Sequence, residues 1–480
     1  MRPLIWFRSD LRVDDNTALS NATRSADDGA VALFVISPAE WKAHDYAPAR
    51  IDLVLRSLAE LSRALDALGI PLLIRTASKP EQVASTVVKA CVESNCDAVF
   101  FNREYEVNEQ RRDQAVIDAL KVKGIHASPW HDQVVMEPAT LRTGTGNIYT
   151  VFTPFKRAWI RVAGEQGGVE PRPGARKVSP CGIRPDAVPT SVHGFECPAP
   201  ISSLWTAGEK HARARLASFI EQGGRKYKDR RDTPSVDGTS GLSPHLAIGT
   251  ISPRRCVAAA VAANTGVKSP MDSGSEGLTT WISELIWREF YVHIVHGFPR
   301  VCMHRAFQKA TEAVRWNDDE AKFKAWCEGR TGIPIVDAGM RQLKATGWMH
   351  NRVRMITAMF LSKNLFIDWR RGERHFMMHL VDGFLASNNG GWQWSASTGT
   401  DAAPYFRIFN PVSQGERFDA DGEYVRRWVP ELASLSNDVI QDPSSLSPLA
   451  LTRLDYPMPI VDLGKSRLAA IEAFKKLRPA

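Results

Sequence analysis

The sequence lacks the features of a secreted or membrane protein. It has seven cysteines in 480 residues and no Cys-x-x-Cys pair, and Cys91 and Cys96 are the closest two. A chain of this length with an odd cysteine count does not need a disulfide framework. The first residues contain no apolar signal segment, and no apolar run is long enough to span a bilayer. We therefore expect a soluble cytoplasmic protein with no membrane partner.

The chain also lacks internal repeats, low-complexity tracts and, after its first predicted strand, a Gly-x-Gly-x-x-Gly dinucleotide fingerprint. What it has is a formal net charge of +8, a pI of about 9.1, and 14 tryptophans that lie mostly in the second half. The basic charge permits a nucleic acid as partner without requiring one. The tryptophans place the unusual chemistry in the second half.

The beginning of the chain alternates short apolar segments with amphipathic ones, a pattern typical of a doubly wound parallel α/β sheet. Predicted strands cover residues 4–7, 30–36, 71–75, 98–102 and 125–127, and predicted helices cover 50–68, 81–94 and 109–122. We expect this α/β domain to span residues 1–130.

Proline and glycine accumulate between residues 164 and 205, which indicates a crossing between domains. Beyond it, strand patterns nearly vanish. Predicted helices cover residues 211–222, 253–263, 279–296, 319–328, 335–346 and 351–364. We therefore expect an interdomain linker over residues 131–205 and a helical domain over 206–480.

The most informative segment is 387–405, where two asparagines and two glycines precede Trp392 and Trp394. Glycine allows close approach to a ligand, asparagine offers neutral donors and acceptors, and tryptophan offers a flat face. The segment predicts a site for a planar aromatic ligand. In an extended backbone the two tryptophans would point to opposite sides.

A predicted helix at 280–291 carries Glu284, Trp287 and Arg288. Spacings of three and four place these side chains on one face. Taken alone, the pattern favours a surface ion pair beside a core tryptophan. The alternative is a cavity wall that combines a carboxylate, an aromatic ring and a guanidinium.

A second helix places Asn351, Arg354 and Met355 on one face. A lone methionine is usually core packing, but the neighbouring asparagine and arginine make a simple core a poorer interpretation.

Three further patterns are weaker. The hydroxyl- and glycine-rich segment 237–243 suits either phosphate binding or a plain helix cap. The basic run 225–232 is either a solvated surface or a phosphate-backbone contact. His375 and His379 are four apart, but the zincin glutamate and a third ligand are missing, so we interpret them as structural and expect no metal.

Four motifs resemble those of the DNA photolyase/cryptochrome family, over essentially the whole chain and in the family's order. They are Trp-Phe-Arg-Ser-Asp-Leu-Arg from residue 6, Glu-Leu-Ile-Trp-Arg-Glu-Phe-Tyr from 284, Thr-Gly-Trp-Met-His-Asn-Arg from 346 and Asn-Asn-Gly-Gly-Trp-Gln-Trp from 388. The closest likeness is to bacterial class I photolyases that act on cyclobutane pyrimidine dimers. The resemblance implies an α/β antenna domain and a helical domain that holds FAD.

The resemblance assigns a flavin-binding role to a set of residues. The implied FAD-binding residues are Tyr227, Thr239, Ser240, Gly241, Leu242, Ser243, Trp281, Arg288, Arg354, Asp382, Gly383, Phe384 and Asn388. Asp382 corresponds to a carboxylate that pairs in the family with the arginine matching Arg354. Asn388 corresponds to the side chain near flavin N5, where a neutral amide is typical of photolyases. Phe384 departs from the family, in which many members have aspartate at this position.

The resemblance also implies roles in repair. The implied lesion-binding and catalytic residues are Glu284, Trp287, Asn351, Met355 and Trp394, with Asn388 on the flavin side. Further implied DNA contacts are Arg231, Arg352 and Gln414. The implied electron relay consists of Trp392, Trp369 and Trp316. Histidines would be expected at Asn351 and Met355 in a (6-4) photolyase, and glutamine at Met355 in the DASH group. The combination present indicates cyclobutane dimers.

The implied antenna residues are Asn108, Glu109 and Cys302, which match folate-binding members. Those members often have a lysine after the cysteine, where this chain has Met303. The match at Asn108 and Glu109 makes methenyltetrahydrofolate the expected antenna. Because Met303 removes a charged contact to the pterin, a deazaflavin or an empty site remains an alternative.

The implied reaction is light-driven electron transfer from reduced FAD to a flipped-out dimer in UV-damaged DNA. The cyclobutane ring splits and the electron returns, with the cofactor supplying the chemistry. We expect a monomer. The alternatives are a signalling cryptochrome and, ranked far below, a thermal flavin oxidoreductase, for which no nicotinamide site is visible.

Overall fold

The computed structural model describes residues 1–477. The chain forms two compact units. Unit 1 comprises Met1–Arg225, Ser240–Pro299 and Val381–Phe384; unit 2 comprises Lys226–Thr239, Arg300–Leu380 and the residues from Leu385 onward. All seven cysteines lie in the described residues, and none of them is in a disulfide. No helix among residues 1–477 is both long enough and apolar enough to cross a bilayer.

Unit 1 is built on a five-stranded parallel sheet with the order β3-β2-β1-β4-β5. The strands are β1 (Pro3–Phe7), β2 (Val31–Ile36), β3 (Leu72–Thr76), β4 (Ala98–Asn102) and β5 (His126–Trp130). All five strands were predicted, with small differences at their ends, and the α/β class with a helical FAD-type domain is confirmed. Chain order reverses between β1 and β4, the point at which open α/β sheets bind ligands beyond their strands' carboxyl ends.

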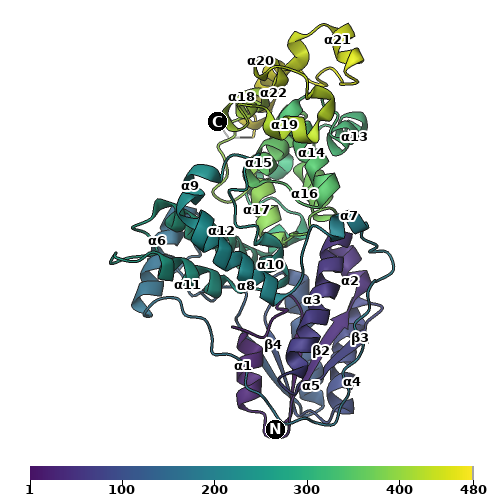
Figure 1. Cartoon of the computed structure of the whole chain (residues 1–480), viewed down its shortest axis with the longest axis vertical. Coiled ribbons are helices and arrows are strands. Elements are labelled where there is room, and N and C mark those ends of the chain that lie inside the picture. The colour runs from purple at the N-terminus through teal and green to yellow at the C-terminus, as the bar shows by residue number, and fades with distance from the viewer. Residues whose placement is uncertain (478–480) are drawn as a thin grey trace. The chain divides into compact units, whose positions relative to one another are not determined.

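The three central strands β2, β1 and β4 are buried on both faces, whereas the edge strands β3 and β5 are partly exposed. Leu4 and Trp6 of β1 face a core that α4 and α5 cover, and the alternate residues Ile5 and Phe7 are buried as well. Alternation within a strand sends neighbouring side chains to opposite faces, so β1 has helices over both of its sides. Figure 1 shows the strands with α3, α4 and α5 alongside them.

The helices of unit 1 follow the predicted pattern, with several additions. They are α1 (Thr17–Arg24), α2 (Pro38–Ala43), α3 (Pro48–Asp66), α4 (Val83–Glu93), α5 (Val107–Val122), α6 (Phe152–Glu165), α7 (Ala199–Ser202), α8 (Glu209–Ser218), α10 (Ser243–Ile248), α11 (Pro253–Ala263) and α12 (Glu276–Gly297). Helix α6 lies inside the segment 131–205 that we had expected to be linker. The three-part division of the chain stays a prediction.

Unit 2 is helical. Its helices are α9 (Tyr227–Arg230), α13 (Glu320–Glu328), α14 (Pro334–Thr346), α15 (Asn351–Met359), α16 (Trp369–Met377), α17 (Leu385–Ala396), α18 (Pro411–Phe418), α19 (Glu423–Trp428), α20 (Asn437–Ile440), α21 (Pro448–Arg453) and α22 (Leu463–Lys475). Their apolar faces share one core that includes Trp326, Trp369 and Trp392. The predicted helix 351–364 is α15 followed by a π-helical turn, Phe360–Asn364.

Candidate functional site

Helix α12 carries Glu284, Trp287 and Arg288, and it begins at Ser275, whose side chain caps the backbone N–H of Leu278. The ring of Trp287 stacks face to face on Phe152 of α6, with centroids 3.6 Å apart and planes inclined by 9°. One face of Trp287 is therefore covered by another ring. Phe152 was not among the predicted site residues, because it lies in the segment that we had interpreted as linker.

Arg288 is held by neutral groups. It donates to the carbonyl oxygens of Gln133 at 2.8 Å and Leu246 at 3.4 Å, and its guanidinium lies 4.5 Å from the ring centroid of Phe384. Burial lowers the pKa of Arg288 from its ordinary value. Because carbonyl and aromatic partners carry no net charge, they leave the positive charge of this side chain available to an anionic ligand.

Unit 1 also contains the predicted flavin residues Ser240, Gly241, Leu242, Ser243, Trp281, Asp382 and Gly383. Arg215 donates to the carbonyl of Ser240 at 2.8 Å, and Gly241 has a φ of +61°. A Cβ at Gly241 would lie 2.6 Å from the Arg215 guanidinium. Positive φ and close approach together require glycine there. This segment precedes α10, as predicted.

The short segment Val381–Phe384 belongs to unit 1 although its neighbours in the chain belong to unit 2. Arg50 of α3 donates to the carbonyl oxygen of Gly383, and Arg50 also lies 4.0 Å from the ring centroid of Tyr46. Asp382 is buried. An arginine of the α/β sheet domain therefore fixes the position of the predicted flavin-contacting segment.

In unit 2, the predicted flavin residues Tyr227 and Thr239 lie in the segment 226–239, and Asn388 lies in α17. The amide nitrogen of Asn388 donates to the carbonyl of Glu373 at 3.0 Å. This bond uses one of the two N–H groups of the amide and orients the side chain. The neighbouring Asn389 donates to the carboxylate of Glu373 at 2.8 Å, which anchors the start of the helix.

Trp392 and Trp394 are helical, so the expectation of an extended backbone was wrong. Residues two apart on a helix lie roughly 200° apart around its axis, so the two rings still diverge. Trp392 is 2 % exposed and makes edge contacts with Phe376 at 4.9 Å and Trp326 at 6.0 Å. Trp394 is partly exposed and its ring lies 6.4 Å from that of Phe409.

The three predicted relay tryptophans differ in exposure. Trp392 and Trp369 are buried, whereas Trp316 is partly exposed and contacts Phe366 with ring centroids 5.0 Å apart. A Cβ at Gly372 would lie 2.1 Å from the ring of Trp392. The ring of Trp392 is therefore seated against the backbone of α16, which carries Trp369.

Two of the three predicted DNA-contacting residues, Arg231 and Arg352, lie beside the same carboxylate in unit 2. Arg352 forms an ion pair with Asp232 at 2.9 Å, and Arg231 lies 3.8 Å from the same carboxylate oxygen. The guanidinium of Arg352 also lies 4.4 Å from the ring of Phe418, one helical turn after Gln414 in α18. The sequence did not identify Asp232 as the shared partner.

The predicted face of α15 is confirmed by burial. Asn351 is exposed and Arg354 and Met355 are partly exposed, whereas Val353 and Ile356 are buried. Arg354 donates to the carbonyl of Met349 at 2.7 Å. Met355 is therefore not a simple core residue.

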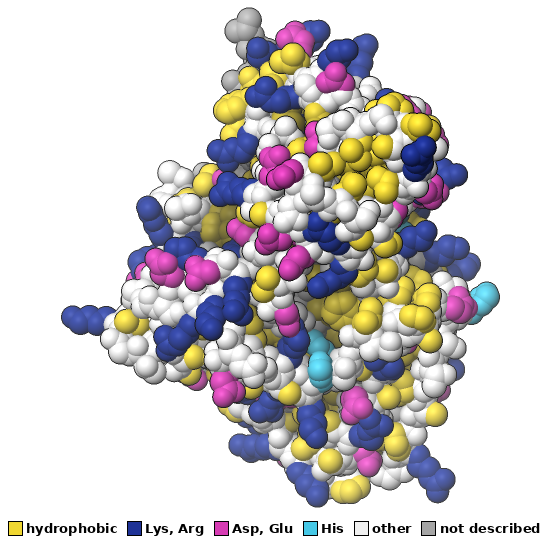
Figure 2. Space-filling view, turned by 45° about the horizontal axis from the view of Figure 1, so that its top comes forward, with side chains coloured by type: hydrophobic (Ala, Val, Ile, Leu, Met, Phe, Trp, Pro, Cys, Tyr) yellow, Lys and Arg dark blue, Asp and Glu magenta, His cyan; other side chains and the backbone are white. Residues whose placement is uncertain are grey.

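A basic groove lies along α6 in unit 1. It is lined by Phe152, Lys156, Arg157 and Arg161, and by Asp272 opposite. It shares Phe152 with the stack on Trp287. Figure 2 shows Lys and Arg spread over the visible face with Asp and Glu between them, so charge alone does not mark one binding surface.

A second cavity opens at the carboxyl ends of β1, β2 and β4, with about 650 Å³ of empty volume that is partly open to solvent. Aromatic side chains line it together with charged ones. The aromatic lining residues are Trp6, Phe34, Trp41 and Tyr46. Four buried polar atoms of its lining have no hydrogen-bond partner among residues 1–477, namely Trp6 Nε1, Arg8 Nε, Ser37 Oγ and Arg50 Nε. Such atoms indicate a ligand.

Asn108 and Glu109, two of the predicted antenna residues, both meet His44 beside this cavity. His44 Nδ1 lies 3.2 Å from Glu109, and Asn108 Nδ2 lies 3.1 Å from His44 Nε2. Burial lowers the pKa of His44 and raises that of Glu109 to about 7. Neutral His44 therefore accepts from Asn108 and donates to Glu109. The third residue, Cys302, lies in unit 2 and is partly exposed.

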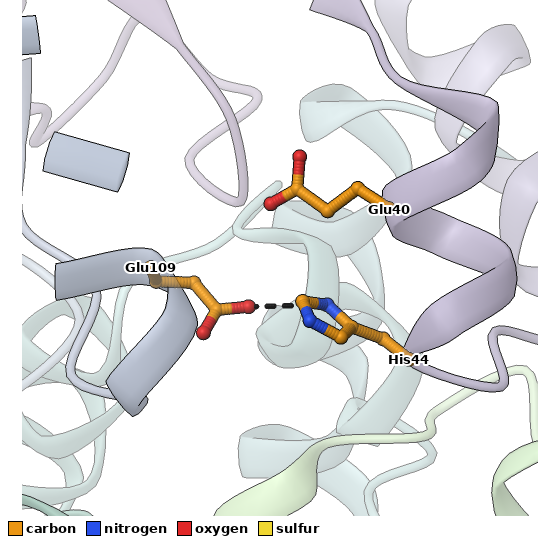
Figure 3. Close-up of side chains that lie close together, drawn as sticks. All are labelled: Glu40, His44 and Glu109. Carbon is orange, nitrogen blue, oxygen red and sulfur yellow. Dashed lines mark ion pairs between the residues drawn. The ribbon is translucent and has the colours of Figure 1, made fainter. Parts of the chain in front are cut away.

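Glu40 completes a group of three possible metal ligands with His44 and Glu109, whose ligand atoms lie within 4.8 Å of one another. Figure 3 shows their side chains pointing toward one another from α2, its C-terminal end and α5. Glu40 pairs with Arg112 at 3.1 Å, and His44 pairs with Glu109. Each group is satisfied by protein partners, so we assign no metal here.

His375 and His379 have ring centroids 4.2 Å apart, but α16 ends at Met377, before His379. His375 also makes an edge contact with Trp326 at 5.4 Å, and burial lowers its pKa to about 3. This packing agrees with the structural interpretation.

Comparisons with known proteins cover the whole chain. A profile described as the FAD binding domain of DNA photolyase matches residues 281–476, and one described as DNA photolyase matches residues 3–173. The deoxyribodipyrimidine photo-lyase of Salmonella typhimurium is 44% identical over 476 residues, which are 99% of this chain and 98% of the relative. That of Vibrio cholerae is 45% identical over 98% of this chain and 99% of the relative.

Two solved structures have the same fold. The crystal structure of a bacterial class III photolyase from Agrobacterium tumefaciens matches with a TM-score of 0.87 and 37% identity, over 99% of this chain and 97% of that one. The cryptochrome of Synechocystis matches with a TM-score of 0.85 and 28% identity, over 99% of each chain.

Proposed function

The chain belongs to the DNA photolyase family and is a light-driven lyase that repairs cyclobutane pyrimidine dimers in DNA, and we propose which residues perform each part of this repair. The identification confirms the resemblance inferred from the motifs. The observation that carries it is the 44% identity to photo-lyases over 99% of the chain. The cryptochrome neighbour is less similar in sequence, at 28% identity, and nothing favours a signalling role.

The residues present fit FAD. Arg288 offers a positive charge that its neutral partners do not cancel, and Gly241 lets the backbone of the hydroxyl-rich segment turn. The amide of Asn388 is oriented by its bond to the carbonyl of Glu373 and still offers an oxygen acceptor and a second N–H. We assign FAD to these residues and to Tyr227, Thr239, Ser240, Leu242, Ser243, Trp281, Arg354, Asp382, Gly383 and Phe384. When bound and reduced, FAD supplies the light-excited electron that splits the cyclobutane ring and then recovers it.

The lesion is bound by Glu284 and Trp287 of α12 and by Asn351, Met355 and Trp394. Trp287, backed by Phe152, offers one rigid aromatic wall to a flipped-out dimer. Glu284 hydrogen-bonds the pyrimidine edge and stabilises charge that develops there. Partial exposure of Met355 and Trp394 leaves both able to reach a ligand.

DNA is held through its phosphates by Arg231 and Arg352, with Gln414 beside them. The two guanidiniums share Asp232, so a phosphate competes with this carboxylate for them. The basic face of α6 adds Lys156 and Arg157, next to the stack on Trp287.

Trp392, Trp369 and Trp316 serve as the relay that carries electrons inward. Burial of the first two and partial exposure of the third give the relay a dry interior and a solvent end. Such an arrangement supports delivery of electrons from a reductant in solution.

Two chromophores are candidates for the antenna, and each would use a different set of residues. Methenyltetrahydrofolate would use Asn108, Glu109 and Cys302. Asn108 and Glu109 would then bond to the ligand in place of His44. A deazaflavin would suit the cavity lined by Trp6 and Trp41, where Trp6 Nε1, Ser37 Oγ and Arg50 Nε have no hydrogen-bond partner among residues 1–477. The crystal structure of an archaeal photolyase from Sulfolobus tokodaii has been described with two FAD molecules, with the implication of a novel light-harvesting cofactor. Acid extraction and chromatography of the purified chromophores would decide between the candidates.

The first experiment uses an oligonucleotide with one thymine cyclobutane dimer, reduced protein, and blue light or darkness. Light-dependent recovery of intact thymines supports the proposal. An absence of repair with reduced FAD bound would reject it and favour a (6-4) substrate or cryptochrome signalling. We also propose that the enzyme acts as a monomer in the cytoplasm.

A further inference from the structure

Lys363 is fully buried in unit 2, where it lies in the π-helical turn after α15. Its Nζ has no hydrogen-bond partner among residues 1–477. The amine instead lies 3.7 Å from the ring centroid of Phe474 in α22. Lysine is almost never fully buried without a partner, because an unpaired buried charge is costly. The position of Lys363 therefore needs a reason beyond packing.

The amine faces an aromatic cluster that includes Trp316. Phe474 contacts Trp316 edge-on at 6.2 Å and Phe366 at 6.3 Å. The separations along this path place the amine within roughly 10 Å of the Trp316 ring. Asn317 fixes the arrangement, since its backbone N–H donates to the carbonyl of Phe366 at 2.7 Å and its side chain to that of Leu365 at 2.9 Å.

We propose that Lys363 is an electrostatic gate on electron transfer from Trp316. In this step one electron leaves Trp316 for oxidised Trp369, and an external thiol later restores it. Loss of the electron leaves a positive charge on the Trp316 ring, which a protonated amine nearby opposes and a neutral amine permits. Lys363 acts through charge alone and makes no covalent bond. The inference rests on the proposed relay.

Titration of Lys363 falls in the useful pH range. Burial lowers its pKa to about 7, and no neighbouring charge contributes to the shift. The turn packs against α15, α16, α17 and α22. The charged side chains of these four helices either bond to another residue or lie at the surface. The bonded pairs are Arg352 with Asp232, Arg354 with the Met349 carbonyl, Arg370 with Glu312, Arg371 with Glu320, Glu373 with Asn389, Lys465 with Asp462, and Glu472 with Lys476. Arg374, Arg467 and Lys475 are exposed, and His375 is neutral because burial lowers its pKa to about 3. The amine is protonated below about pH 7 and neutral above it, so the gate opens as pH rises.

The test measures how fast blue light reduces the bound flavin of oxidised protein in the presence of a thiol, from pH 6 to 8. For the wild-type protein we expect a rise of about tenfold across this range. Lys363→Met should be fast at every pH, and Lys363→Arg, which keeps its charge, should be slow at every pH. Parallel profiles for wild type and Lys363→Met would overturn the proposal.

Two measurements keep the outcome interpretable. Titration of ¹³C-labelled lysine by NMR in the wild-type protein needs no variant, and an amine that titrates only near its ordinary value above pH 10 would also overturn the proposal. Trp316→Phe tests the relay itself, because an unchanged rate of flavin photoreduction in that variant would reject the relay. If Trp316→Phe is slow but the Lys363 variants have the same pH profile as the wild-type protein, only the gate is rejected.

Discussion

Replacement of Phe152 by leucine should weaken discrimination between damaged and undamaged DNA. The ring of Phe152 lies flat on Trp287, with centroids 3.6 Å apart, so it fixes the orientation of the proposed lesion wall. Leucine keeps most of the apolar volume of the side chain and removes only the flat aromatic ring that stacks on Trp287. A stacked aromatic pair contributes about 0.5–1.5 kcal/mol beyond its buried area, which corresponds to a change of roughly two- to tenfold in an equilibrium constant.

The assay compares dark binding of a duplex with one thymine dimer and of the same duplex without it. We expect the ratio of the two dissociation constants to fall by roughly two- to tenfold in Phe152→Leu, because only the flipped dimer reaches Trp287. Binding of the undamaged duplex should change little, since phosphate contacts dominate it.

Phe155→Leu is the matched control. Phe155 lies on the same helix, is 1 % exposed, and contacts Phe290 at 5.3 Å and His293 at 4.9 Å. Its loss should lower thermal stability at least as much without loosening the stack on Trp287. Equal ratios in the two variants would refute the reasoning, since the effect would then come from general destabilisation.

Three other predictions follow from single contacts. Glu284→Ala should lower the repair yield by about tenfold while FAD stays bound; loss of flavin absorbance would contradict the assigned role. Asp232→Asn should release Arg352 and Arg231, so DNA binding should tighten and the slope of log K against log salt should steepen by about 1; an unchanged slope in a salt titration would refute this. Glu289, buried between the N–H groups of residues 135 and 136, has a pKa that burial raises to about 7. The folded state holds this proton more tightly than the unfolded state, so up to about 3 kcal/mol of the free energy of unfolding is lost as pH rises from about 4.5 through 7. In denaturant titrations, the free energy of unfolding of Glu289→Gln should therefore depend less on pH than that of the wild-type protein.

The central strands of the sheet were predictable because both of their faces are buried. Near-continuous apolar runs such as 30–36 have few interpretations other than a parallel strand, and the five strands were all found. Helix α6 was missed for the opposite reason. It lies between polar loops and a Gly- and Pro-rich stretch, and its apolar residues Phe152 and Phe155 find their partners only in α12, far along the chain. The buried residues Phe152, Phe155 and Trp159 of α6 do recur at helical spacing, but the Gly- and Pro-rich composition that follows led us to interpret the whole segment as linker.

The sequence identified candidate site residues that belong to a motif, but it did not identify the partners from other segments of the chain that these residues contact. The resemblance identified Arg352, but only the fold shows that Arg231 shares Asp232 with it. In the same way Asn108 and Glu109 were expected, whereas their common partner His44 lies in a different segment of the chain. Lys363 gave no signal at all, because burial of a lysine is decided by packing rather than by its neighbours in sequence.

Under the proposed assignment, Arg50 connects the candidate antenna cavity with the flavin-contacting segment. It lines the cavity at the carboxyl ends of the strands, and it also donates to the carbonyl of Gly383, beside the Phe384 ring that holds Arg288. One guanidinium therefore joins the candidate antenna cavity to the predicted flavin-contacting segment within unit 1. A planar fork with several donors can hold both groups in one geometry, which a lysine could not do.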